Sequence, residues 1–157
     1  KKNQTTGSLV VELHPRERLK IFVTAGSAPC ITPFKPFLPA APWEDAGRGG
    51  ALYSEDSVWW NHEAMYLNAM VRPHAYRETI AERIRAMEDR WGSEYPSHSW
   101  DSRDPSLVKL SGSAFTQAQE ADRIFLEQMK GVRVEKYSLA GYYWRKIAHR
   151  TGVSGMP

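Results

Sequence analysis

The sequence contains one cysteine, Cys30, and its thiol is the first candidate for covalent chemistry. A cysteine becomes a nucleophile when a base or a nearby positive charge favours its thiolate. Cys30 instead lies among prolines in an apolar run, and no histidine is close to it in the sequence. Since free cysteine is among the most buried residue types, we interpret Cys30 as a structural thiol. A single cysteine also excludes an internal disulfide and a multi-thiolate metal site.

The five histidines do not form a helical metal site, because none lies three or four residues from another. His62-Glu63 begins like the HExxH motif of zinc proteases, but Tyr66 stands where the second histidine is needed. Trp59, His62 and Tyr66 also fall at helical spacing. We therefore interpret His62 as a hydrogen-bonded core histidine, and we expect no metal and no cofactor.

Hydroxyl groups gather just before the first apolar run, in Thr5-Thr6-Gly7-Ser8. Such hydroxyls could donate to a substrate carboxylate, and a glycine lets another backbone approach closely. From the residues alone, this segment is only the polar start of a strand. The sequence therefore contains no self-sufficient catalytic set.

Length and charge limit the function classes. A chain of 157 residues is long enough for one domain with its own core. Its formal charge is +3, and basic and acidic residues are interleaved, so we expect no nucleic-acid partner. No apolar run approaches the roughly 20 residues of a membrane span. The compartment is left open, with the cytoplasm slightly favoured.

The elements that must position these residues fall into two parts. Residues 1–42 are expected to form β strands, and residues 43–157 a helical lobe of the same domain. Apolar runs at 8–13 and 19–24, separated by a polar turn, predict a hairpin. A third extended segment at 30–38 carries prolines that are expected to forbid a helix.

Four helices are expected in the second part. Caps and glycines set their limits: Ser54 before the first, Pro73 and Gly92 around the second, Ser113 and Gly131 around the third, and 138–149, before Gly152, for the fourth. The fold class is therefore α+β.

The order of three segments adds a family resemblance. TTGSLVVELHP is followed by LKIFVTAGSAPCITPFKPF and, after a loop, by LYSEDSVWWNHEAMYLNAM. This order resembles the secernin and bacterial dipeptidase family, most closely at Phe34-Lys35-Pro36-Phe37 and at Trp59-Trp60-Asn61-His62-Glu63. The resemblance covers residues from about 5 to 92, and from 113 to 150 only as a helix pattern.

The resemblance implies part of an αββα sandwich of an N-terminal-nucleophile (Ntn) hydrolase. In that class a cysteine at the mature N-terminus attacks the amide, and its own α-amino group acts as the base. The implied substrates are dipeptides or small amides, and no metal or organic cofactor is implied.

The chain departs from the family in lacking the nucleophile region, which lies upstream of the matched segments. Cys30 lies in the strand region and cannot take that role. We therefore expect no catalytic residue in this chain, no activity from it alone, and a partner in the upstream polypeptide of the same enzyme. Thr6 and Ser8 are expected to line the rim of the substrate site, and Val10, Ile21, Val23 and Ile31 to join a larger sheet.

Two alternatives remain open at this point. The chain could be a non-catalytic, secernin-like interaction protein, since a lobe rich in tryptophan and tyrosine could bind a partner, and it could form a homo-oligomer. It could also be an unrelated α+β binding domain in which the short motifs coincide by chance.

Overall fold

The structure is a computed structural model, and it describes residues 7–13, 19–24, 26–39, 50–95, 104–134 and 139–153. These residues form an α+β fold with a three-stranded antiparallel sheet and five α-helices. The prediction of an α+β fold is therefore confirmed, and the αββα sandwich stays a prediction. All three strands come from the first 42 residues of the chain.

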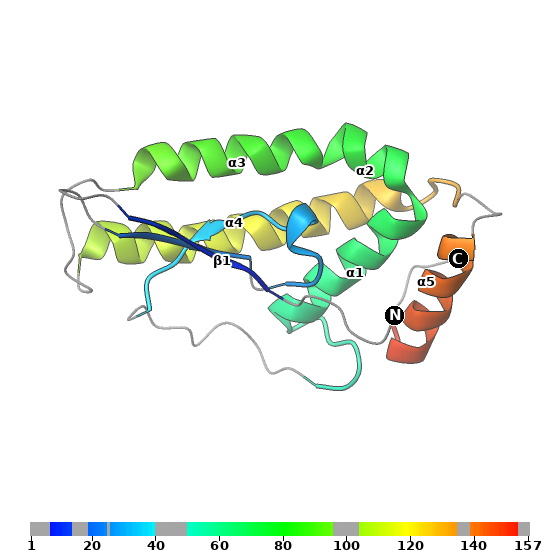
Figure 1. The fold of residues 1–157 in the computed structure, drawn as a ribbon. Coiled ribbons are helices and arrows are strands. Elements are labelled where there is room, and N and C mark those ends of the chain that lie inside the picture. Colours follow the sequence, from blue (N-terminus) through cyan, green and yellow to red (C-terminus); the bar gives the residue numbers. More distant parts are fainter. Residues whose placement is uncertain are drawn as a thin grey trace. The chain divides into compact units, whose positions relative to one another are not determined.

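The sheet is formed by β1 (Leu9–Glu12), β2 (Lys20–Val23) and β3 (Lys35–Pro36), in the order β1-β2-β3 (Figure 1). β1 and β2 are antiparallel, with Leu9 opposite Val23 and Glu12 opposite Lys20. The predicted hairpin is therefore confirmed. The salt bridge between the Glu12 carboxylate and the Lys20 amine, at 3.8 Å, joins the two strands across the pair.

The third extended segment is shorter than predicted. Pro29–Ile31 forms a 3-10 helix, η1, and only Lys35 and Pro36 pair with β2. The expectation that prolines forbid any helix here was wrong, because Pro29 is the first residue of η1. The missing N–H of a proline is not needed at that position.

The five helices are α1 (Val58–Val71), α2 (Pro73–Thr79), α3 (Ala81–Glu94), α4 (Pro105–Met129) and α5 (Leu139–Thr151). Two predicted helix starts were wrong. α1 is capped by Ser57, whose side chain accepts from the Trp60 amide, and not by Ser54. α4 begins after Asp104, which accepts from the Ser106 amide at 2.9 Å, so Ser113 lies inside the helix.

The predicted second helix is divided in two. Ile80 separates α2 from α3, and α3 continues through Gly92, which was expected to end it. The two later helix ends agree better with the sequence. Gly131 and Gly152 follow α4 and α5 with φ angles of 87° and 76°, the left-handed conformation that glycine adopts without strain.

The chain divides into two compact units, each with its own buried residues. The first unit contains residues 1–44 and 83–118, and the second contains 45–82 and 119–157. The first buries Trp91 and Tyr95 from α3 and its end, together with residues of the first half of α4. The second buries most of α1, including Met65 and Leu67, and Phe125 from the second half of α4.

Tyr95 joins α3 to the sheet in the first unit. Its ring lies 5.5 Å from the ring of Phe22, and its hydroxyl accepts from the Ile21 amide at 3.3 Å. Burial raises the pKa of Tyr95 above its ordinary value of 10.0, although the hydrogen bond from Ile21 acts in the opposite direction. The neutral phenol is therefore the form that the folded state prefers.

We predict that the free energy of unfolding decreases as the pH rises above 10.0, because Tyr95 ionises more easily in the unfolded chain. Urea unfolding of the parent and of Tyr95→Phe across this range checks the prediction. Tyr95→Phe should show a shallower alkaline decrease, whereas Tyr142→Phe, at a position 63% exposed in the second unit, should keep the parent slope. Equal slopes in the parent and Tyr95→Phe would contradict it.

Candidate functional site

Of the two predicted site residues, the structure describes Ser8, which directly precedes β1. The Ser8 amide donates to the Thr24 hydroxyl oxygen at 2.8 Å, and the Thr24 amide donates to the Ser8 carbonyl at 3.0 Å. Ser8 is half-buried and Gly7 is exposed. Thr6, the other predicted residue, lies outside the described residues. The start of β1 is therefore fixed to the end of β2 by two hydrogen bonds.

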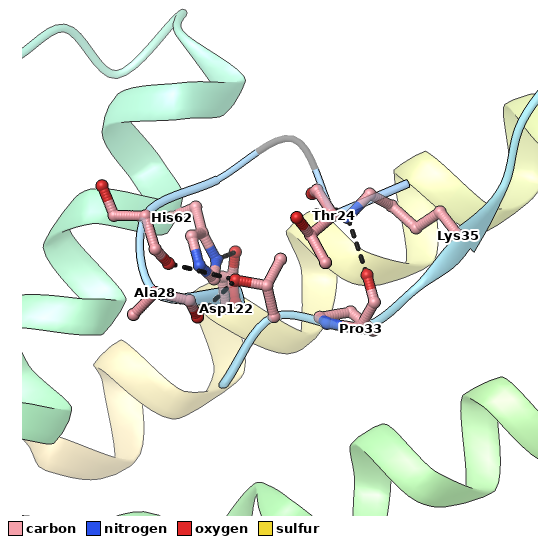
Figure 2. Close-up of polar contacts among 8 residues, drawn as sticks. Thr24, Ala28, Pro33, Lys35, His62 and Asp122 are labelled. Atoms are coloured by element: carbon pink, nitrogen blue, oxygen red, sulfur yellow. Dashed lines mark hydrogen bonds and ion pairs between the residues drawn. The ribbon is translucent and has the colours of Figure 1, made fainter. Parts of the chain in front are cut away.

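The next residue in this network is Lys35, whose side chain is buried. Its ammonium group donates to the Thr24 carbonyl at 2.5 Å and to the Pro33 carbonyl at 3.0 Å (Figure 2). It also lies 5.3 Å from the centre of the Phe115 ring, within the range of a cation–π interaction. A buried charge is costly unless it is hydrogen-bonded, so these acceptors are needed for Lys35 to be buried.

Thr24 connects the two interactions, since its backbone carbonyl contacts Lys35 while its hydroxyl contacts Ser8. We call Ser8, Thr24 and Lys35 the Ser8 cluster. Its hydrogen bonds fix the backbone that presents the Ser8 hydroxyl. The cluster can therefore orient a donor for a substrate group, but it contains no activated nucleophile.

The segment between Thr24 and Lys35 is held by further polar contacts. The Thr32 hydroxyl can donate to the Ser27 carbonyl at 3.1 Å or to the Ala28 carbonyl at 3.2 Å. Ala28 has a φ angle of 52°, a left-handed conformation that costs a non-glycine residue about 1 kcal/mol or more. A segment with this strain keeps its shape only when its surroundings determine it.

Cys30 is exposed, so the prediction that its thiol is buried was wrong. Cys30 is the middle residue of η1, between Pro29 and the buried Ile31. The 3-10 turn places Ile31 in the core and Cys30 at the surface, an outcome that an extended strand through this segment does not predict.

The second unit contains a separate buried polar pair, between α1 and α4. His62 Nδ1 lies 2.9 Å from Asp122 Oδ2, and both side chains are at most 9% exposed (Figure 2). The interpretation of His62 as a hydrogen-bonded core histidine is confirmed. A carboxylate at Nδ1 fixes the orientation of the ring, which joins the two helices at this point.

Asp122 was missed in the sequence, although one signal was available. It lies four residues after Ala118 and three before Phe125, and both of these are buried on the same helix face. An acidic residue at a core position of a helix indicates a buried partner. The partner itself, 60 residues away, could not be identified from spacing.

Arg72, between α1 and α2, is a third buried polar group. Its Nε donates to the Val132 carbonyl at 2.9 Å, and its Nη1 donates to Asn68 Oδ1 at 2.6 Å. Burial lowers the pKa of Arg72 from its ordinary value. Because both acceptors belong to the protein and lie beside helix ends, the guanidinium group joins the α1–α2 junction to the segment after α4.

No group of three or more histidine, cysteine, aspartate or glutamate side chains in the described part of the chain is arranged to hold a metal ion. Within the same residues, no helix combines the length and apolar character that crossing a membrane requires.

Comparison of the sequence and structure with models of protein families, with curated proteins and with solved structures gave no match.

We predict that Lys35→Met lowers the free energy of unfolding by about 2–3 kcal/mol, because the Thr24 and Pro33 carbonyls lose a charged donor. Urea denaturation measures the change. Lys109→Met, at an exposed position of α4, is the matched control and should change it by less than about 0.5 kcal/mol. A Lys35→Met protein as stable as the control would contradict the structural role of this lysine.

A second prediction concerns the histidine pair. Asp122→Asn keeps the shape of the side chain but removes its charge, and it should lower the free energy of unfolding by about 1–3 kcal/mol. His62→Ala should cost at least as much, and the double variant should cost less than the sum of the two. Asp89→Asn, at an exposed position of α3, is the matched control. Strictly additive losses would show that the two side chains do not interact.

Proposed function

We propose that this chain is the part of an amidohydrolase that lacks the nucleophile, in an enzyme that cleaves dipeptides or other small amides. Preceding polypeptide would provide the N-terminal cysteine and the remaining strands of an αββα Ntn-hydrolase sandwich. The proposal rests on the resemblance to the secernin and bacterial dipeptidase family. The structural observation that carries it is the outer edge of β1.

β1 is exposed along its whole length. Leu9, Val10 and Val11 are 58%, 47% and 39% exposed, so both faces of this apolar strand are accessible. Among the described residues, β2 pairs with one side of β1 and no strand pairs with the other. Proteins seldom leave an apolar edge strand uncovered, because it templates pairing with other chains. These features support a larger sheet in which β1 is an inner strand.

The hydrogen-bond pattern identifies which backbone groups face this edge. Ser8 and Thr24 form a hydrogen-bonded pair, so by alternation Val10 and Glu12 also direct their backbone groups towards β2. The N–H and C=O groups of Leu9 and Val11 must then point away from β2. An added strand would pair with these two residues.

Ser8 lies at the start of this strand. In the resembled family the matching strand belongs to the catalytic sheet, and its start lies towards the nucleophile. A hydroxyl there can donate to the carboxylate of a dipeptide, and the contacts of Thr24 and Lys35 hold the backbone that carries it. The upstream cysteine would attack the amide carbon while its α-amino group takes the thiol proton. The amine product would leave, and water would hydrolyse the thioester.

The test is dipeptide hydrolysis by this chain alone, by the polypeptide encoded upstream of Lys1, and by the two together. We expect activity only when both are present and the upstream part begins with cysteine. Activity from this chain alone would contradict the proposal, as would an upstream sequence without sheet-forming segments and an N-terminal cysteine.

In the active assembly, Ser8→Ala and Thr6→Val should each lower kcat/KM by roughly ten- to a hundredfold, the usual value of a polar contact in a site. Ser93→Ala, at an exposed position of α3, is the matched control and should leave it unchanged. Unchanged kinetics in both Ser8→Ala and Thr6→Val would remove these residues from the rim of the site.

The second candidate function is that of a non-catalytic interaction protein. The observation that favours it is a pair of exposed tyrosines, Tyr142 and Tyr143, on α5. An assembled complex that contains the upstream cysteine but hydrolyses no dipeptide would favour this function over the first.

A further inference from the structure

Among the described helices, α5 carries basic side chains and no acidic one. The sequence has 21 lysines and arginines and 18 aspartates and glutamates. α5, with the sequence LAGYYWRKIAHRT, contains Arg145, Lys146 and Arg150 and no acidic residue. Without these three, the remaining 18 basic residues equal the 18 acidic ones. The formal charges outside α5 therefore sum to zero at pH 7.

The exposed residues of α5 share one side of the helix. Tyr142, Lys146 and His149 are four and three residues apart, and Tyr143 and Arg150 fall two turns apart beside them. All five are exposed, with Tyr142 at 63% and Tyr143 at 47%. We call these five residues the α5 face.

The opposite side of α5 packs against α1 (Figure 1). The Trp144 ring lies 5.2 Å from the Tyr66 ring, Ala148 is fully buried, and the Thr151 carbonyl accepts from the Tyr53 amide at 2.9 Å. Trp144 also contacts the ring of Tyr143, at 5.0 Å. α5 is therefore anchored through its apolar side. The contact with Trp144 orients the Tyr143 ring of the α5 face.

The stability of α5 accounts for only some of the residues of the α5 face. His149 and Arg150 lie in the last turn, where a positive charge interacts favourably with the helix dipole. Lys146 and the two tyrosines lie before that turn. Tyrosine and arginine are enriched at protein interfaces, and tyrosine provides both contact area and a polar group.

We propose that the α5 face binds an acidic segment of a partner protein. Lys146 and Arg150 would pair with carboxylates of that segment, and the Tyr142 and Tyr143 hydroxyls would donate to further carboxylates or to its backbone. Charge complementarity selects the partner, since the charged side chains of this helix are all basic. Binding at the α5 face does not require hydrolase activity.

The geometry favours an acidic protein segment over two other anionic partners. Proteins that bind nucleic acid tightly contact many phosphates, often six to ten, and α5 offers three permanent cations on a helix of about 20 Å. An amphipathic helix on a membrane inserts its apolar side into the lipid. In α5 that side is already occupied by its contacts with α1.

The experiment titrates the chain with a decaglutamate peptide at about 50 mM salt, where surface charges are weakly screened. Backbone amide shifts in NMR spectra locate the site and give the affinity. Decaglutamine, a short DNA duplex, and vesicles of phosphatidylcholine with phosphatidylserine are titrated in parallel. We expect decaglutamate alone to bind and to shift the amides of α5.

The variant Lys146→Glu/Arg150→Glu should weaken decaglutamate binding at least tenfold, and Tyr142→Ala several-fold. The matched control is Arg85→Glu/Lys109→Glu, which makes the same change in net charge at exposed positions of α3 and α4. Equal weakening by both double variants would overturn the proposal, because it would show an effect of net charge only. Binding to DNA or vesicles without decaglutamate, or no binding to any probe, would also overturn it.

Discussion

The burial of the Lys35 ammonium group is the constraint on which the first unit depends. A charge out of water needs acceptors, and Lys35 finds them at the two ends of the segment that links β2 to η1 and β3, in Thr24 and Pro33. The same Thr24 binds the start of β1 through its side chain. The buried Lys35 ammonium group therefore determines the path of this connection. Through Thr24, it also determines the position of Ser8.

β2 pairs with one edge of β1, and among the described residues no strand pairs with its other edge. Leu9 and Val11 direct their backbone groups to an edge that no described strand covers, while Val10 and Glu12 are held by β2. An exposed apolar strand fixed in this way is prepared for pairing. Under the proposed function, this edge pairs with a strand of the preceding polypeptide.

Local chemistry predicted some elements well. Two β-branched runs with a polar turn were enough for the hairpin, and Gly131 and Gly152 mark helix ends because a left-handed residue is needed there. The starts of α1 and α4 were not predicted, because serine and aspartate are frequent and the sequence does not show which of them accepts a hydrogen bond from a helix amide. For the candidate site, the sequence placed Ser8 at the start of a strand, and its role in substrate binding stays a prediction. The contacts of Lys35 and the His62–Asp122 pair depend on the tertiary structure, which residue spacing does not reveal.

Hydrogen exchange of the β1 amides tests the central claim, that β1 is prepared to become an inner strand, most directly. In this chain alone, the Leu9 and Val11 amides should exchange rapidly, and the Val10 amide, which faces β2, should exchange more slowly. Adding the upstream polypeptide should slow exchange at Leu9 and Val11 and change it little at Val10. Protection of Leu9 and Val11 in the chain alone, or no change on adding the upstream polypeptide, would contradict the account.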